Sequence, residues 1–387
     1  MLFLALFASQ SGVLVMSPIL SDVASEFGVS VAAAGQLRIL AAPLAAVVAV
    51  AAGRFMMRFS PRPLLGAGSV LLALGSAASA VAPSFVLLAL AQVPMWSGLA
   101  ILLAAGVAAA SSWSEPERRT KVVAHALAGP PSAWIVGMPV IGLVGTVDWR
   151  LAFIALPLPA ALLAGVTAAL RPRDTPVATE GASLARLLRR PQARRWALGE
   201  LLANSAWAGT LVFSGALFTE HYGMSSAGTG LVLAAVAVAY LVGNQRAGRA
   251  QPSRARRAML EGSVAASIAV ALTWAVTPGI AVTAVLFAAT AGLAAMRTVA
   301  GTVFGFATAG ELGREVGVVR ATTTQLGYLI GSLVGGLALA TGGFALLSIA
   351  FGGLFLAATL PYLCLRRPCP FEVAGPVATQ PAGSPTR

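Results

Sequence analysis

Apolar runs of about twenty residues or more, separated by short polar connections, constrain this chain more than any other feature. Charged residues make up only 10% of the sequence, whereas soluble domains usually carry about 25%. A helix of roughly 20 apolar residues crosses the hydrocarbon core of a bilayer. Backbone groups in lipid must pair internally, and these long Ala, Leu, Val and Gly runs lack the short alternating segments of a β-barrel. The sequence therefore predicts an all-α membrane protein.

Twelve apolar runs can be marked along the 387 residues, and each predicts one transmembrane helix. Two connections, Pro83-Ser84 and Pro278-Gly279, are short enough to make the flanking helices antiparallel neighbours. The expected spans are residues 2–21, 32–56, 63–82, 85–111, 122–146, 151–170, 196–219, 227–247, 258–277, 280–304, 317–340 and 343–365.

The positions of the basic residues predict how these spans are oriented. Of the 26 Lys and Arg residues, Arg38 and Arg297 fall inside spans and Arg150 alone lies in one set of connections. The other 23 lie in the alternate connections, in the tail or within about a turn of them. Because cytoplasmic loops are enriched in Lys and Arg, we expect those connections and both termini to be cytoplasmic. The net charge of +13 follows this alternation, which argues against a nucleic-acid partner.

The use of Arg in place of Lys, with heavy use of Ala and Gly, is typical of a bacterial genome of high GC content. Lys121 is the single lysine of the chain. We therefore expect a multi-pass protein of the bacterial cytoplasmic (inner) membrane.

The longest interior connection divides the chain into two similar halves. An offset of 190 residues places Gly137 on Gly327 and Gly145 on Gly335, on corresponding spans. Two pseudo-symmetric six-helix bundles suggest a transporter with a midplane site between them. The expected units are an N-terminal bundle (1–170), a cytoplasmic linker (171–195), a C-terminal bundle (196–365) and a disordered cytoplasmic tail (366–387).

Several motifs lie in places that are typical of one transporter family. The fifth span carries Gly129-Pro130-Pro131, then Gly137-Met138-Pro139 and Gly142, and Trp149-Arg150 follows it. Gly53, Arg58 and Arg62 lie between the second and third spans, with Met57 where the family has an aspartate. In these motifs the chain resembles the major facilitator superfamily, and within it bacterial drug/proton antiporters and sugar-efflux-type permeases. The resemblance implies a twelve-helix fold, alternating access and export of a small molecule against proton entry.

Glycines spaced four apart form rows on two helices. Gly327, Gly331 and Gly335 repeat in the eleventh span the spacing seen in the fifth. Such a row lies on one helix face and lets another backbone approach closely. Two readings remain open, plain helix packing and a rocking interface between the halves.

Ionisable residues inside spans are costly and are therefore functional candidates. Glu200, about one turn into the seventh span, is the first candidate for a proton-carrying carboxylate, since burial favours its neutral form. Asp22 is the second, although it can instead cap or gate the outer end of the first span. Arg297 lies roughly 9 Å from the cytoplasmic end of its span. It can bind an anionic group of a substrate, pair with Glu200, or extend to the surface.

Arg38 lies inside the second span, about two turns from its outer end. It can contact substrate, pair with Asp22 or Glu26 as a gate, or extend outward. Arg320 and Glu261 lie within a turn of the cytoplasm, where surface positions are expected.

Uncharged polar and aromatic residues complete the expected substrate site, because such sites are mostly apolar with a few placed polar groups. As a set they favour a moderately amphipathic substrate. They are Gln10, Gln92, Trp96, Trp134, Asn204, Trp207, Gln325 and Tyr328.

No enzyme or metal motif is found in the sequence. There is no Walker loop for ATP, and the only histidines, His125 and His221, are expected on opposite sides of the membrane. We therefore expect a monomeric, cofactor-free secondary transporter for a drug-like compound, sugar or metabolite, coupled to protons. Two alternatives remain, facilitated uptake or exchange of an organic anion, and a non-transporting membrane sensor or scaffold.

Overall fold

The computed structural model describes residues 1–37, 43–45, 47–48, 51, 61–113, 125–126, 128–171, 184–247, 254–276, 279–309 and 313–363, and these ranges contain helices and no strands. The first half of the chain forms α1 (Leu2–Leu14), α2 (Met16–Glu26), α3 (Val31–Gly35), α5 (Pro61–Ala80), α6 (Phe85–Ser112), α8 (Gly129–Gly145), α9 (Leu151–Ala155) and α10 (Pro157–Ala169). The second half forms α11 (Leu184–Leu188), α12 (Pro191–Ala216), η1 (Leu217–His221), α13 (Ser226–Ala247), α14 (Ala255–Ala275), α15 (Ile280–Ala309), α16 (Gly313–Ala357) and α17 (Leu360–Leu363).

Nine helical stretches of the described chain are long and apolar enough to cross a membrane. The fifth expected span is the shorter helix α8, and most of the second (32–56) lies outside the described residues. The eleventh and twelfth spans both fall in α16, which contains a break at Gly343, where φ is 62°. Only glycine adopts this left-handed conformation easily, so Gly343 marks the boundary between two consecutive helices. The arrangement is consistent with the expected twelve spans.

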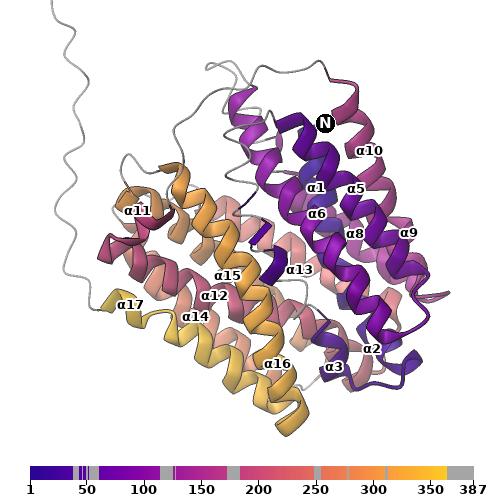
Figure 1. The fold of residues 1–387 in the computed structure, drawn as a ribbon. Coiled ribbons are helices and arrows are strands. Elements are labelled where there is room, and N and C mark those ends of the chain that lie inside the picture. The colour runs from indigo at the N-terminus through magenta and orange to yellow at the C-terminus, as the bar shows by residue number, and fades with distance from the viewer. Residues whose placement is uncertain are drawn as a thin grey trace, which may run out of the picture.

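The helices form two groups, one from each half of the chain (Figure 1). In the N-terminal half α5 packs against α6 and α10, and α1 packs against α6 and α8. In the C-terminal half α12 packs against α16, and α14 and α13 pack against α15. Lipid provides little hydrophobic drive between helices, so close packing of small residues holds them together. Each half therefore forms its own bundle.

The linker helix α11 is attached to the C-terminal half. Leu187 is fully buried in a cluster that includes Trp196 and Tyr362. Arg190 donates to the carbonyl oxygen of Ala309 at 2.8 Å, where a cation is favourable at the end of α15. Since α12 begins at Pro191, the seventh span starts five residues before the expected position of 196.

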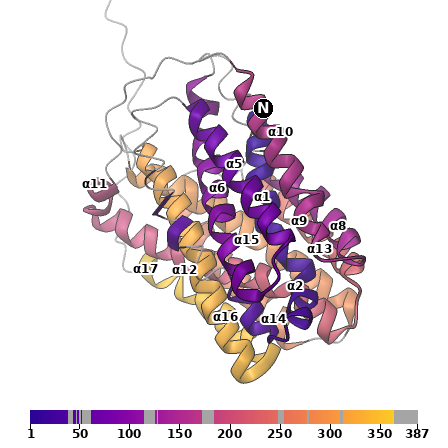
Figure 2. The ribbon, with the colours of Figure 1, turned by 45° about the vertical axis from the view of Figure 1, so that its right-hand side comes forward.

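The two halves meet along α8 and α13. They also meet where α2 and α3 pack against α12 and α16 (Figures 1 and 2). The hydroxyl of Ser17 donates to the carbonyl oxygen of Leu211 at 2.7 Å. Ser21 and Thr219 share a hydrogen bond of 2.8 Å. Gly215 lies directly against the backbone carbonyl of Ser17, where a Cβ would collide. The halves are therefore in tight contact at this end.

Candidate functional site

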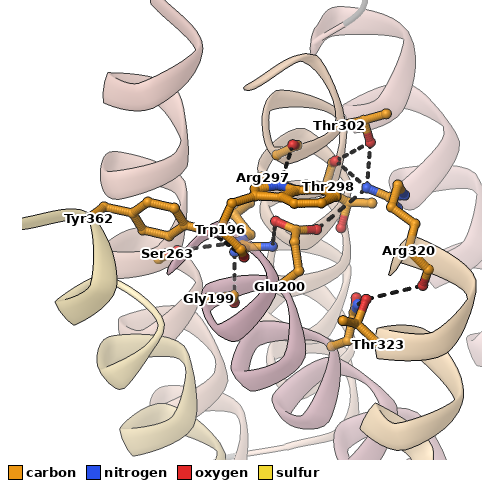
Figure 3. Close-up of polar contacts among 12 residues, drawn as sticks. Trp196, Gly199, Glu200, Ser263, Arg297, Thr298, Thr302, Arg320, Thr323 and Tyr362 are labelled. Atoms are coloured by element: carbon orange, nitrogen blue, oxygen red, sulfur yellow. Dashed lines mark hydrogen bonds and ion pairs between the residues drawn. The ribbon is translucent and has the colours of Figure 1, made fainter. Parts of the chain in front are cut away.

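Glu200 on α12 forms a fully buried ion pair with Arg297 on α15 (Figure 3). The Nη1 of Arg297 donates to Oε1 of Glu200 at 2.7 Å, and the two side chains are 1% and 0% exposed. Arg297 also donates from Nη2 to the carbonyl oxygen of Gly199 at 2.9 Å and from Nε to the hydroxyl of Ser263 at 3.3 Å. Burying a charge costs several kcal/mol unless such partners replace water. Every nitrogen of this guanidinium has a partner.

Arg320 on α16 is a second cation at the same carboxylate. Its Nη1 lies 3.4 Å from Oε2 of Glu200, donates to the carbonyl oxygen of Thr298 at 3.1 Å and also donates to the hydroxyl of Thr302. The side chain of Arg320 is 23% exposed. Three helices therefore meet at one carboxylate, and the group, which we call the charged triad (Glu200, Arg297 and Arg320), carries one surplus positive charge.

Small and aromatic residues around the triad explain why the helices can approach so closely. A Cβ at Gly301 of α15 would collide with the carboxylate of Glu200. One turn before Glu200, Trp196 donates from Nε1 to the carbonyl oxygen of Gly301 at 2.8 Å. The hydroxyl of Tyr362 donates to the carbonyl oxygen of Trp196 at 3.1 Å. The position of Glu200 is therefore fixed by contacts on both sides of α12.

Three aromatic rings from both halves lie together, and we call them the aromatic cluster (Trp134 on α8, Trp207 on α12 and Tyr240 on α13). The ring centroids of Trp207 and Tyr240 are 5.5 Å apart, and that of Trp134 lies 5.2 Å from Tyr240. Trp134 donates from Nε1 to the side-chain oxygen of Gln10 at 3.4 Å. These contacts bring four helices together across the junction of the halves.

The aromatic cluster adjoins the charged triad through Thr298. The side chain of Tyr240 lies close enough to Thr298 and Arg320 to interact with both, and the carbonyl oxygen of Thr298 accepts from Arg320. Asn204, one turn after Glu200, donates to the hydroxyl of Thr323 at 3.3 Å. Polar, aromatic and charged groups thus form one continuous set.

The other expected substrate-site residues lie in separate places. Trp96 and Tyr328 form an edge-to-face pair between α6 and α16, with centroids 5.5 Å apart. Gln92 is buried within the N-terminal half, where it donates to the hydroxyl of Ser79 at 2.9 Å. Gln325 is buried on α16, and its side-chain oxygen has no hydrogen-bond partner among the described groups. The structure does not bring Gln92 to the triad or the cluster.

Asp22 and Glu26, the charged candidates on α2, do not belong to the charged triad. Asp22 is exposed on α2. Glu26 accepts from Nη1 of Arg150 at 2.5 Å and from Trp149, so its partners lie within the N-terminal half. Arg38, the other candidate gate partner, lies outside the described residues.

The residues of the family motifs also lie in different parts of the structure. Gly53 and Arg58 lie outside the described residues, and Arg62 donates to the carbonyl oxygen of Ala169 at 2.6 Å. Pro130 lies in the first turn of α8, and Pro139 is inside that helix, two residues after the buried Gly137.

The glycine rows have two different surroundings. Gly129 packs on the backbone of α1, and Gly142 packs on the backbone of α13 in the other half. The row of Gly327, Gly331 and Gly335 packs on α12 within the C-terminal half. Of the two readings of these rows, Gly142 fits an interface between the halves, and the row on α16 is internal packing.

Sequence reasoning assigned Arg320 to the surface and did not include Thr298 or Thr302. The available signal was helical spacing, since Arg320 precedes Gly327 by seven residues and lies on the same face. That face packs on α12, which carries Glu200. The described residues contain no group of His, Cys, Asp and Glu that could hold a metal ion.

Comparisons with known proteins agree with this architecture. The sequence profile of the Major Facilitator Superfamily matches residues 2–219. The structure of a D-xylose–proton symporter superposes with a TM-score of 0.73 at 14% identity, covering 93% of this chain and 95% of the other. A bacterial homologue of the human lysosomal transporter Spinster, in an inward-facing and occupied conformation, gives 0.71 at 15% identity, covering 94% of both chains. The E. coli fucose:proton symporter gives 0.63 at 14% identity, covering 94% of this chain and 97% of the other.

A search of curated proteins gave no match. The profile covers more than half of the sequence, the membrane-spanning helices are present, and the fold is that of solved transporters. This chain belongs to the major facilitator superfamily and is a multi-pass membrane transporter.

Proposed function

We propose that the protein is a proton-coupled secondary transporter of a small organic molecule, in which Glu200 carries the proton. The observation that supports this most directly is a carboxylate with 0% exposure, held between Arg297 and Arg320 from two other helices. A proton on Glu200 would remove the charge that attracts both arginines. Loading and release of the proton would thereby loosen and restore the contacts of α12 with α15 and α16.

Alternating access gives this switch a role in transport. The halves are in close contact where α2 and α3 meet α12 and α16, and the distribution of basic residues supports an orientation with that end outside the cell. We therefore propose that this conformation is closed to the outside. The glycine contact of Gly142 with α13 supports a hinge between the halves.

Two transport functions fit a carrier with this site. The motif of the fifth span resembles drug/proton antiporters, which supports export of a drug-like compound, sugar or metabolite against proton entry. A second candidate is facilitated uptake or exchange of an organic anion, favoured by the presence of two arginines at a single carboxylate. In both, the aromatic cluster and Asn204 would face the substrate, and Arg297 would act through its pair with Glu200.

The cellular setting completes the proposal. We propose a monomer in a bacterial cytoplasmic membrane, with both termini in the cytoplasm and with six-helix bundles at 1–170 and 196–365. The basic connections on one side support this orientation. Asp22, exposed at the end of α2, remains a second candidate for proton coupling.

Proton flux in proteoliposomes tests the proposal. Vesicles containing the protein and an internal pH dye are exposed to ethidium, xylose and benzoate, which represent a drug-like cation, a sugar and an organic anion. The signal of protein-free vesicles is subtracted, because neutral benzoic acid crosses lipid unaided and carries a proton with it. We expect at least one compound to move protons, and we expect Glu200→Gln to abolish that movement. Glu261→Gln is the matched control, since its carboxylate is 62% exposed. Undiminished proton movement in Glu200→Gln would remove Glu200 from the mechanism, and no movement with any compound would argue against coupling.

A further inference from the structure

The two arginines of the charged triad differ in what they still have to offer a ligand. Arg297 is 1% exposed and uses Nη1, Nη2 and Nε for Glu200, Gly199 and Ser263. Arg320 is 23% exposed, and its contacts with Glu200, Thr298 and Thr302 all involve the single nitrogen Nη1. Its Nη2 and Nε have no described partner. Arg320 therefore keeps donors in the fork geometry that holds a carboxylate by two parallel hydrogen bonds.

The charges of the triad leave Arg320 only partly compensated. Glu200 is the one described carboxylate in contact with either arginine, and it lies closer to Arg297, at 2.7 Å, than to Arg320, at 3.4 Å. A cation in a membrane-embedded site is costly without a counter-charge. A single negative charge on a ligand would neutralise the group.

The surroundings of Arg320 also define the rest of the ligand. Arg320 donates to Thr298 and lies near Tyr240, and Tyr240 is a member of the aromatic cluster, with Trp207 and Trp134 beside it. Trp134 and Tyr240 are partly exposed. Flat apolar groups stack on such rings, so the rings near this cation suit an aromatic body.

From these observations we infer that the substrate is an aromatic monocarboxylate, whose carboxylate is bound by Arg320 and whose ring lies on the aromatic cluster. This assignment rests on the proposed function, because it concerns the substrate of the same site. It makes Arg320 a specificity-determining residue and leaves Arg297 to hold Glu200.

A consequence for coupling follows from the described groups that face Glu200. They are Arg297 on α15, Arg320 on α16, and the phenol groups of Tyr362 on α17 and Tyr240 on α13. A proton on Glu200 leaves Arg320 without its one described counter-charge. The proton and the anion therefore strengthen each other's binding, and this coupling is reciprocal. The inference favours joint movement of an organic anion and a proton over export against proton entry.

Equilibrium binding to the purified full-length protein in detergent, measured by calorimetry, tests the assignment. The probes are benzoate and indole-3-acetate, each compared with its neutral amide. Loss of a hydrogen-bonded charged contact is worth about 10- to 100-fold in affinity, so we expect the carboxylates to bind at least about tenfold more tightly than the amides. Arg320→Gln should remove that preference, and Arg320→Lys should keep part of it.

Two further variants distinguish a failure of this inference from a failure of the proposed function. Arg257→Gln is the matched control, because that arginine is 80% exposed, and it should bind like the unmodified protein. Glu200→Gln should bind the carboxylates at least as tightly, because it removes the negative charge facing Arg320, so loss of proton coupling in the flux assay leaves this result unaffected. Equal binding of carboxylates and amides, absence of carboxylate binding, or an unchanged preference in a folded Arg320→Gln protein would overturn the inference.

Discussion

The buried pair of Glu200 and Arg297 should behave as an energetic unit. Arg297→Met leaves the carboxylate of Glu200 in the bundle with only the longer contact to Arg320 at 3.4 Å. Glu200→Gln leaves Arg297, which is 1% exposed, without its counter-charge. Removing one partner of a buried pair costs about 3–5 kcal/mol. If the two effects were independent, the double variant would lose about 6–10 kcal/mol by the same principle.

The double variant replaces the pair with neutral side chains and should lose far less. Its remaining costs are the unpaired carbonyl of Gly199 and hydroxyl of Ser263, at about 1–3 kcal/mol for each buried group left unsatisfied. Taking the middle of each range, about 8 kcal/mol for independent losses and about 4 kcal/mol for the double variant, we expect an interaction energy of about 4 kcal/mol, larger than the ~0.5 kcal/mol by which independent sites deviate. The interaction energy is reduced because Arg320 can shift toward Glu200 in the absence of Arg297.

Reversible unfolding in SDS, followed by tryptophan fluorescence, gives the four free energies of unfolding of this cycle. The matched control is the pair of Arg257 and Glu261, whose ion pair also measures 2.7 Å but whose side chains are 80% and 62% exposed. Water screens that pair, so its cycle should show no measurable coupling. Additive losses for Arg297→Met and Glu200→Gln would refute the reasoning.

Two further predictions concern the contacts between helices. Gly215→Leu places a side chain against the carbonyl of Ser17, so the halves should separate where α2 meets α12 and hydrogen exchange of the α2 amides should rise. Gly66→Leu is the control, since nothing lies within 4 Å of a Cβ there. Unchanged exchange in Gly215→Leu would contradict the closed junction. Trp207→Leu removes two ring contacts of the aromatic cluster and should lower the free energy of unfolding by about 1–3 kcal/mol. Tyr240→Phe keeps the stacking and should lower it by about 1 kcal/mol or less. The SDS titration measures both variants, and an equal loss would contradict the stacking argument.

Much of the fold was predictable because a bilayer imposes a simple physical rule on the sequence. Each span must be long and apolar, and the turns must lie outside the hydrocarbon region. The turn at Pro83-Ser84 and the break near residue 342 were placed to within a residue or two, at the start of α6 and at Gly343. The family was also predictable, because its motifs are local in sequence.

The site was predictable only in part, because it depends on rotations of helices that hydropathy does not determine. The pairing of Arg297 with Glu200 was one of the expected alternatives, since both residues are charged and buried by their position in the spans. Arg320 was assigned to the surface because its distance from the span end was counted along the sequence, whereas its side chain turns inward toward Thr298. Gln92 was grouped with the substrate-site residues because a polar residue in a span suggests function, yet Ser79 of the neighbouring helix satisfies it.

The docking of α11 has a consequence for how far the protein can open. Leu187 and Arg190 fix this helix to the C-terminal bundle, so the covalent tether to the N-terminal bundle is only the thirteen steps from Arg171 to Leu184. A chain spans at most ~3.3–3.6 Å per residue, which limits the separation of those two anchor points to about 45 Å. The tether thus sets an upper bound on the swing of the bundles, and shortening it by a few residues would reduce that swing without touching either bundle.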